Sequence, residues 1–220
     1  MYVCVPYRGF MTSAQAVARR ERELLCSAFE RLGPDAPTLC DGWRTRDLAA
    51  HLIARESRPD AAAGLVIPAL RDRLNNVMTT IGAKPWPELV NLVRNGPPAW
   101  SPMRYTEGLA NLVEFVVHRE DVLRAQGEPT LEDRDRDTMS VLWQRVNMSA
   151  ALMFRHDAVD IVCPDFGHWR SRRSRSGMLT ATITGSPVEV LLLATGRPHR
   201  CSIDGDPQAR AEFEQRRRAI

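Results

Sequence analysis

The sequence predicts an α+β protein in which a helical N-terminal part precedes a small α/β part. Apolar residues recur at helical spacing before His156, whereas short alternating, β-branched segments follow it. A chain of 220 residues, with 44% hydrophobic and 26% charged residues, can bury one sizeable core or two small ones. We therefore expect a helical bundle over residues 11–155 and an α/β domain over residues 156–220.

Helical patterns account for most of the N-terminal part. They lie over residues 13–32, 45–58, 61–81, 105–125 and 133–155. Gly33-Pro34 ends the first of them, and Thr45 can cap the second. The third helical pattern is interrupted, or begins, at Pro68. Residues 82–103 contain five prolines, so we expect a loop there with at most a short helix over residues 87–95.

The C-terminal part consists of shorter elements. We expect a strand over residues 158–164, a strand and turn over 166–177, further strands over 178–185 and 199–205, and a last helix over 206–218. Between the later strands, Ser186 can cap a helix, Pro187 occupies its first position and Gly196 closes it. Strands and helices that alternate in this way are typical of a small α/β domain.

Residues 1–10 differ from the chain that follows, because the helical pattern begins abruptly at Met11. They lack the basic start and the long apolar core of a secretory signal. Two interpretations are open: a non-native or disordered extension upstream of a natural start at Met11, or a short ordered arm. No apolar run approaches the roughly 18–20 residues that cross a bilayer, so we expect no membrane segment.

Cysteines and charges restrict the compartment and the partners. The five cysteines are scattered and form no CxxC pair: Cys4, Cys26, Cys40, Cys163 and Cys201. This pattern argues against a disulfide framework and a thiolate zinc site, and it predicts a cytoplasmic protein. The net charge of +3 is small, although arginines cluster within residues 170–175 and 216–218. Nucleic-acid-binding proteins ordinarily show a larger basic bias or a recognisable motif, so we expect no nucleic-acid partner.

The segment NLVEFVVHRED, residues 111–121, is the first candidate for a functional site. Glu114 and His118 are four residues apart, which on a helix places them on one face about 6 Å apart. Apolar residues surround both, so the carboxylate and the imidazole are expected to be buried and to need a partner. A divalent metal ion would satisfy both side chains.

A strand is the alternative structure for this segment, because LVEFVV is rich in β-branched residues. In a strand, Glu114 and His118 would share a face but lie about 13 Å apart, which is too far to bind one ion. The length and composition of residues 107–125 favour a helix. Even on a helix, the pair admits a simpler interpretation as a contact between glutamate and histidine without a metal.

His51 supplies a third candidate ligand. It lies in DLAAHL, residues 47–52, where a lone histidine is more often a core residue than a ligand. Two helices of one bundle can nevertheless bring ligands together in its core. A set made of His51, Glu114 and His118 would leave at least one coordination position open, which is typical of catalytic rather than structural metal sites.

Three other residues near these motifs each have two interpretations. Asp47 and Asp121 are candidate acceptors for the N–H groups of the ligating imidazoles, or else they are capping or surface acids. Cys40 lies just before the helix of His51 and could be a nucleophile. Because no neighbouring base is evident in the sequence, we interpret Cys40 as a buried packing residue.

Three separated motifs together resemble a known family. LCDGWRTRDLAAHL, EFVVHRED, and TITGSPVEVLLLATGR followed by IDGDP are similar, in this order, to motifs of the mycothiol-dependent maleylpyruvate isomerase family. More narrowly, the chain resembles an actinobacterial branch described only as metal-binding. The likeness covers about Met11 to Asp206. It implies a DinB-like four-helix bundle over residues 11–155, followed by a small α/β domain.

The resemblance also implies ligands and an activity. It implies a divalent metal, usually zinc, held by the histidine of the DLxxHL helix and by the ExxxH pair, which here are His51, Glu114 and His118. It further implies mycothiol as a thiol cosubstrate and a transferase or isomerase that acts on a small electrophile. A non-catalytic metal-binding or ligand-sensing module is the alternative, because no acid–base residue is identifiable beside the ligands. A monomer is favoured in both cases.

Overall fold

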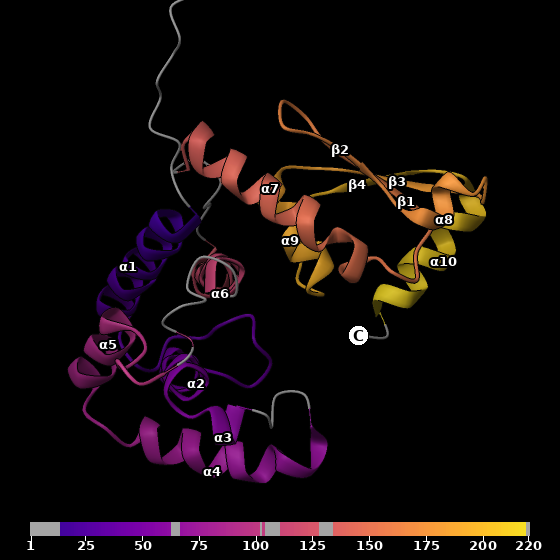
Figure 1. Ribbon diagram of the computed structural model, residues 1–220. Coiled ribbons are helices and arrows are strands. Elements are labelled where there is room, and N and C mark those ends of the chain that lie inside the picture. Colours follow the sequence, from indigo (N-terminus) through magenta and orange to yellow (C-terminus); the bar gives the residue numbers. More distant parts are fainter. Residues whose placement is uncertain (1–13, 63–66, 102, 104–110, 128–133, 219–220) are drawn as a thin grey trace, which may run out of the picture.

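The computed structural model describes residues 14–62, 67–101, 103, 111–127 and 134–218. Helices and a four-stranded mixed sheet make up the molecule, which confirms the α+β class (Figure 1). Residues 1–10, interpreted above as an extension or an arm, lie outside the described residues. Within the described ranges, no helix is long and apolar enough to span a membrane.

Helices make up the N-terminal part of the chain. In order they are α1 (Ala14–Leu32), α2 (Thr45–Ser57), α3 (Pro59–Ala62), the 3₁₀ turn η2 (Pro68–Leu70), α4 (Arg71–Gly82), α5 (Trp86–Asn95), α6 (Leu112–Ala125) and α7 (Arg136–Met153). The short helix expected in the proline-rich loop is α5. The predicted helix over residues 105–125 corresponds to α6, and its expected first residues lie outside the described ranges.

The start of α2 differs from the prediction that Thr45 caps it. The backbone is extended at Arg44, so this residue is the N-cap and Thr45 already lies inside the helix. The Asp47 carboxylate accepts a hydrogen bond from the Arg44 N–H at 2.9 Å. The Thr45 hydroxyl instead donates to the carbonyl of Gly33 at 2.6 Å, because the end of α1 lies beside the start of α2.

Residues 112–125 form the helix α6, so the strand interpretation of this segment is wrong. Figure 1 looks almost along α6, with α1, α2 and α9 (Pro187–Ala194) around it. Leu112, Phe115 and Val116 are fully buried, and α6 packs along α1. Burial on several sides outweighs the low helix propensity of the β-branched residues.

The helices α1, α2, α5 and α6 share one apolar core. Its fully buried members include Leu25 and Phe29 of α1, Leu48 and Leu52 of α2, and Phe115 of α6. Burying each of these side chains contributes roughly 1.5–3 kcal/mol to folding. The core therefore fixes α2 against α6, the two helices that carry the candidate ligands.

The C-terminal part is built around the sheet. Its elements are β1 (Val159–Cys163), β2 (Gly167–Arg170), α8 (Arg172–Arg175), β3 (Ala181–Thr184), α9, β4 (Ser202–Gly205) and α10 (Pro207–Arg218). The strand order is β2-β1-β3-β4, with β1 and β3 parallel and the other pairs antiparallel. Ser186 caps α9 as predicted, because its hydroxyl accepts from the Glu189 N–H. The turn expected after β2 contains the short helix α8.

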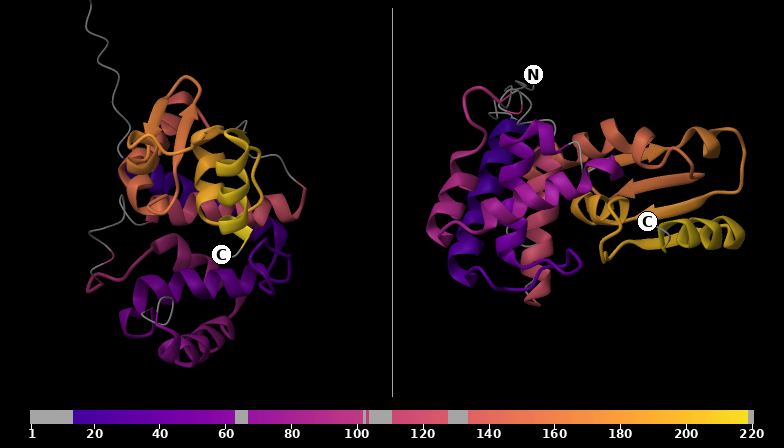
Figure 2. Two further views of the ribbon diagram at one scale, coloured as in Figure 1. Left: turned by 90° about the vertical axis from the view of Figure 1, so that its right-hand side faces the viewer. Right: turned by 90° about the horizontal axis from the view of Figure 1, so that it is seen from below.

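One face of the sheet packs on helices. Ile161 of β1 and Ile183 of β3 lie opposite each other and are fully buried, whereas their neighbours alternate toward solvent. The apolar cluster around them includes residues of α7, α9 and α10, and it continues to Val17 of α1 and Val116 of α6. Figure 2 shows the helical part and the sheet part side by side, joined through α6, α7 and α9.

A buried ion-pair network also joins the two parts. The Arg134 guanidinium binds both carboxylate oxygens of Glu21 at 2.9 Å and Glu120 at 2.7 Å. Glu120 in turn accepts from Arg124 at 2.6 Å, and Arg124 donates to Glu189 of α9 at 2.6 Å. The network therefore runs from α1 through α6 to α9.

Candidate metal centre

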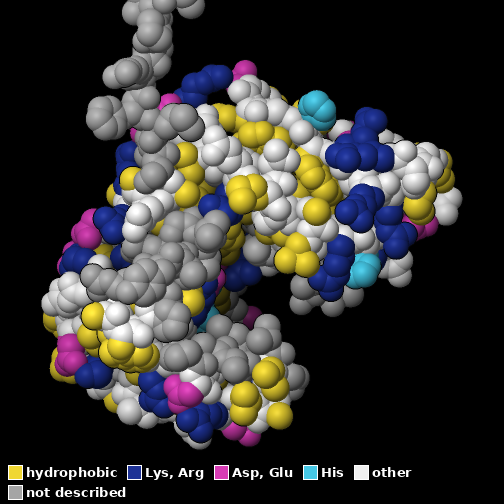
Figure 3. Space-filling model, in the orientation of Figure 1, with side chains coloured by type: hydrophobic (Ala, Val, Ile, Leu, Met, Phe, Trp, Pro, Cys, Tyr) yellow, Lys and Arg dark blue, Asp and Glu magenta, His cyan; other side chains and the backbone are white. Residues whose placement is uncertain are grey.

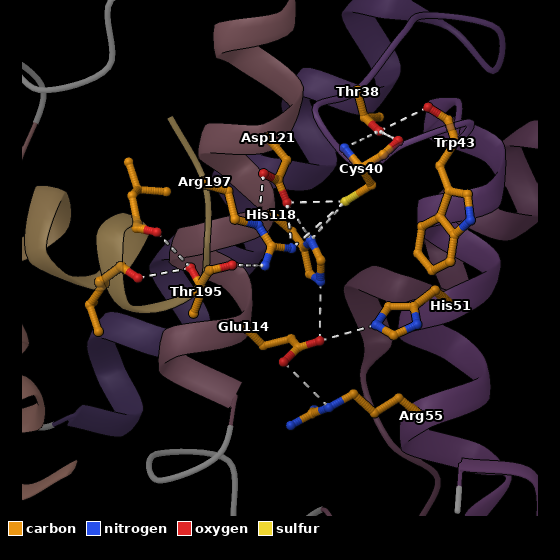
Figure 4. A network of polar contacts seen from close by, with 12 residues as sticks. Thr38, Cys40, Trp43, His51, Arg55, Glu114, His118, Asp121, Thr195 and Arg197 are labelled. Atoms are coloured by element: carbon orange, nitrogen blue, oxygen red, sulfur yellow. Dashed lines mark hydrogen bonds and ion pairs between the residues drawn. The ribbon is translucent and has the colours of Figure 1, made fainter. Parts of the chain in front are cut away.

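The structure brings together the side chains of His51, Glu114 and His118 (Figure 4). The Oε1 atom of Glu114 lies 3.1 Å from Nε2 of His51 and 3.1 Å from Nε2 of His118. One ligand atom from each residue lies within 4.8 Å of the others. His51 comes from α2, and the other two residues lie one turn apart on α6, so the packing of these helices creates the cluster.

Burial and neighbouring charges set the protonation of this cluster. Burial lowers the pKa of His51, and the hydrogen bond with Glu114 does not offset this effect. Burial also disfavours charge on His118, but contacts with Asp121, Cys40 and Glu114 raise its pKa well above the ordinary value. For Glu114, burial opposes ionisation, yet hydrogen bonds with both histidines hold its pKa well below the usual range. The cluster thus favours one ionised carboxylate between two different imidazoles.

The two imidazoles differ because, among the described residues, only one has a partner for its Nδ1 atom. Nδ1 of His118 lies 2.9 Å from Oδ2 of Asp121, whose side chain is fully buried. Nδ1 of His51 is buried and has no hydrogen-bond partner among the described residues. The Trp43 ring packs against the His51 ring with centroids 5.1 Å apart. Histidine ligands of metals ordinarily donate their second N–H to an acceptor, and Asp121 is placed to accept from His118.

Asp47 and Asp121, the two carboxylates considered as such acceptors, occupy different positions. Asp121 contacts His118 directly. Asp47 lies at the first turn of α2, where its carboxylate accepts from the Arg44 N–H. Asp47 is therefore a capping residue of α2, one of the two interpretations that the sequence left open.

Cys40 packs against the helical core as predicted, but it is only partly buried and also lies beside the histidine–aspartate pair. Its Sγ atom is 3.2 Å from Oδ2 of Asp121 and 3.8 Å from Nδ1 of His118. The Leu39 N–H donates to the Asp121 carbonyl at 3.0 Å, which holds this loop against α6. A contact that depends on how a loop folds onto a distant helix leaves no pattern in the local sequence.

Arg197 is a site residue that the sequence did not single out. It follows the C-terminus of α9, and its Nε and Nη2 atoms lie 3.3 Å from the two carboxylate oxygens of Asp121. The only local signal is its place directly after Gly196, within the last of the three motifs. The C-terminal part thus reaches the candidate metal centre through residues 195–198.

A cavity of about 590 Å³ opens onto the three candidate ligands. One wall comes from the loop of Cys40 and Trp43 and from α2 and α6, and the other comes from residues 195–198. Figure 3 shows a hollow between the helical part and the sheet part. A volume in this range admits a small molecule with several polar groups.

The environment of the cysteines predicts a difference in reactivity. Burial raises the pKa of the thiols of Cys26, Cys163 and Cys201 to about 12, whereas Cys40 lines the cavity. In the folded protein at about pH 8, we expect iodoacetamide to modify those three thiols at least about 100-fold more slowly than Cys40. Peptide mass spectrometry over a time course measures this ratio, and denatured protein is the control. Equal rates for Cys26 and Cys40 in the folded protein would contradict the described burial.

Comparisons with known proteins place this fold. No protein-family model and no curated protein sequence matches the chain. Among solved structures, it is similar to the crystal structure of the mycothiol-dependent maleylpyruvate isomerase, with a TM-score of 0.60 and 14% identity over 88% of this chain and 92% of that one. A histidine-to-alanine mutant of that isomerase gives a TM-score of 0.58 with the same identity and coverage. At this identity, the likeness shows a shared fold.

Proposed function

We propose that the chain binds one divalent metal ion through Nε2 of His51, Oε1 of Glu114 and Nε2 of His118, and that it uses a small-molecule thiol as a nucleophile. The observation that carries the proposal is the convergence of these three atoms at the floor of the cavity. Zinc is the favoured metal, because two imidazole nitrogens and one carboxylate oxygen are a frequent ligand set of catalytic zinc.

The donor set suits a metal by its chemistry as well as its position. Glu114 is held ionised and accepts from both imidazoles at one oxygen, so a cation placed between them would replace these two contacts. Asp121 would orient His118 through Nδ1 and increase its basicity as a ligand. With these three protein ligands, a bound ion would keep at least one coordination position for a further ligand.

A thiol is the cosubstrate that this position favours. A bound divalent cation lowers the pKa of a coordinated thiol and presents it as a thiolate nucleophile. Mycothiol is our candidate, because the fold is shared with an isomerase that depends on mycothiol. Arg197 lines the cavity and would offer positive charge to anionic groups of the bound molecules. Attack of the thiolate on a small electrophile leads to either isomerisation or thiol transfer.

Turnover by the zinc-loaded protein tests this function. We expect mycothiol-dependent conversion of at least one compound in a panel of small electrophiles, followed by absorbance of the electrophile and by free thiol content. The His51→Ala variant should lose more than about 100-fold of this rate, because it lacks a ligand while Cys40 and Arg197 remain. Mycothiol binding without turnover of any electrophile would instead support the alternative, a non-catalytic ligand-sensing module.

A further inference from the structure

The two carboxylate oxygens of Glu114 have different partners. Oε1 faces both histidines, whereas Oε2 lies 3.6 Å from Nε of Arg55. Arg55 is one turn after His51 on α2, and its side chain is only 14% exposed. One oxygen of the carboxylate therefore faces the metal position and the other faces a guanidinium (Figure 4).

Buried polar contacts fix the guanidinium of Arg55. Its Nη1 atom donates to Oδ1 of Asn111, which is fully buried. Asn111 donates through Nδ2 to Glu56 at 2.8 Å, and Glu56 is paired with Arg22 through both oxygens at 2.6 and 2.8 Å. Because each member is held by the next, Arg55 is positioned from inside the helical core.

We propose that Arg55 is a positioning residue that restricts Glu114 to binding the metal through one oxygen, and so keeps a coordination position free for the thiol. This proposal rests on the metal-dependent function proposed above. A carboxylate that binds through both oxygens would fill that position, but Oε2 would then have to leave the guanidinium.

The positive charge of Arg55 also favours a thiol in the open coordination position. A dication bound by two neutral imidazoles and one carboxylate keeps a net positive charge. A guanidinium next to the carboxylate adds to the positive potential at the cavity floor. This potential favours an anionic thiolate over neutral water as the remaining ligand. Arg55 therefore influences which molecule binds in the open position without touching it.

Cobalt(II) is a suitable probe, because its visible bands weaken when coordination increases from four to five ligands, and a bound thiolate adds a charge-transfer band in the near ultraviolet. We compare the parent protein with Arg55→Met and Arg55→Lys, using 2-mercaptoethanol as the thiol. The matched control is Arg46→Met, because Arg46 also lies on α2 but donates to carbonyls of Gly82 and Lys84.

The expected result is that Arg55→Met binds one equivalent of cobalt with weakened visible bands. Its titration midpoint for 2-mercaptoethanol should rise at least about tenfold. Arg55→Lys should fall between this variant and the parent, because lysine restores the charge but not the planar fork. Arg46→Met should match the parent in both measurements.

Three results would overturn the proposal. The first is a folded Arg55→Met variant with the bands and thiol midpoint of the parent. The second is a folded Arg55→Met variant that binds no cobalt, which would make Arg55 necessary for metal binding itself. The third is a parent protein without cobalt bands, and only this result also removes the proposed function. If Arg55→Met does not fold, the cobalt bands and the 2-mercaptoethanol midpoint of Arg55→Lys test the proposal in its place.

Discussion

Replacement of Glu114 or His118 by alanine is expected to abolish metal binding in purified protein. The parent should contain about one equivalent of zinc after reconstitution, because three converging donors and an open position suit this ion. Glu114 is the only anion among the three donors and lies between the other two. Loss of a hydrogen-bond partner outside the ligand set costs roughly 10- to 100-fold in metal affinity. Loss of Glu114, a candidate ligand itself, should lower the metal affinity by more than this.

Elemental analysis beside a competitive chelator titration measures this affinity. Matched controls are Glu88→Ala and His168→Ala, because Glu88 is paired with Lys84 on the surface and His168 is exposed on β2. Both controls should keep the metal. A parent protein that stays free of metal after reconstitution would mean that the three side chains form only a buried polar cluster.

Arg134→Met is expected to lower the free energy of unfolding by about 3–5 kcal/mol. The side chain of Arg134 is 1% exposed and carries the positive charge between Glu21 and Glu120, whose side chains are also buried. These carboxylates hold its pKa above the usual value, although burial opposes its charge. Methionine fills similar space without compensating them. Glu21 keeps its contact with Arg119 and Glu120 keeps Arg124, but both buried carboxylates lose the cation that they share.

Urea unfolding followed by circular dichroism measures this change. Arg20→Met is the matched control. Arg20 pairs with Asp135, the residue after Arg134, but the side chains of this pair are more than half exposed. The control should lose no more than about 1 kcal/mol. Equal losses in the two variants would show that the buried network makes no special contribution to stability.

Local sequence was sufficient to predict the secondary structure that carries the site. The cap at Ser186, the short helix between prolines and the helical spacing of Glu114 and His118 each depend on residues a few positions apart. The start of α2 was predicted one residue late, because Thr45 turns toward the end of α1. That contact depends on how the chain reverses after Gly33.

The surroundings of the ligands could not be predicted in this way. Cys40 and Arg197 both contact Asp121, but they are separated from it by 81 and 76 residues. Contacts of this kind depend on the packing of α9 and of the Cys40 loop against α6. A single sequence reports the chemistry of such residues, but not their distance from one another.

The residues that line the cavity come from two kinds of structure, helices and connecting segments. All three candidate metal donors lie on helices whose apolar faces are fixed in the core, whereas Cys40 and Arg197 lie on connecting segments. Connecting segments tolerate substitution and changes of length better than packed helices do. Under the proposed function, changes in these segments would alter the preference for an electrophile while the helices keep the three candidate donors in place. Libraries restricted to residues 36–43 and 195–198 are therefore the economical starting point for redirecting its specificity.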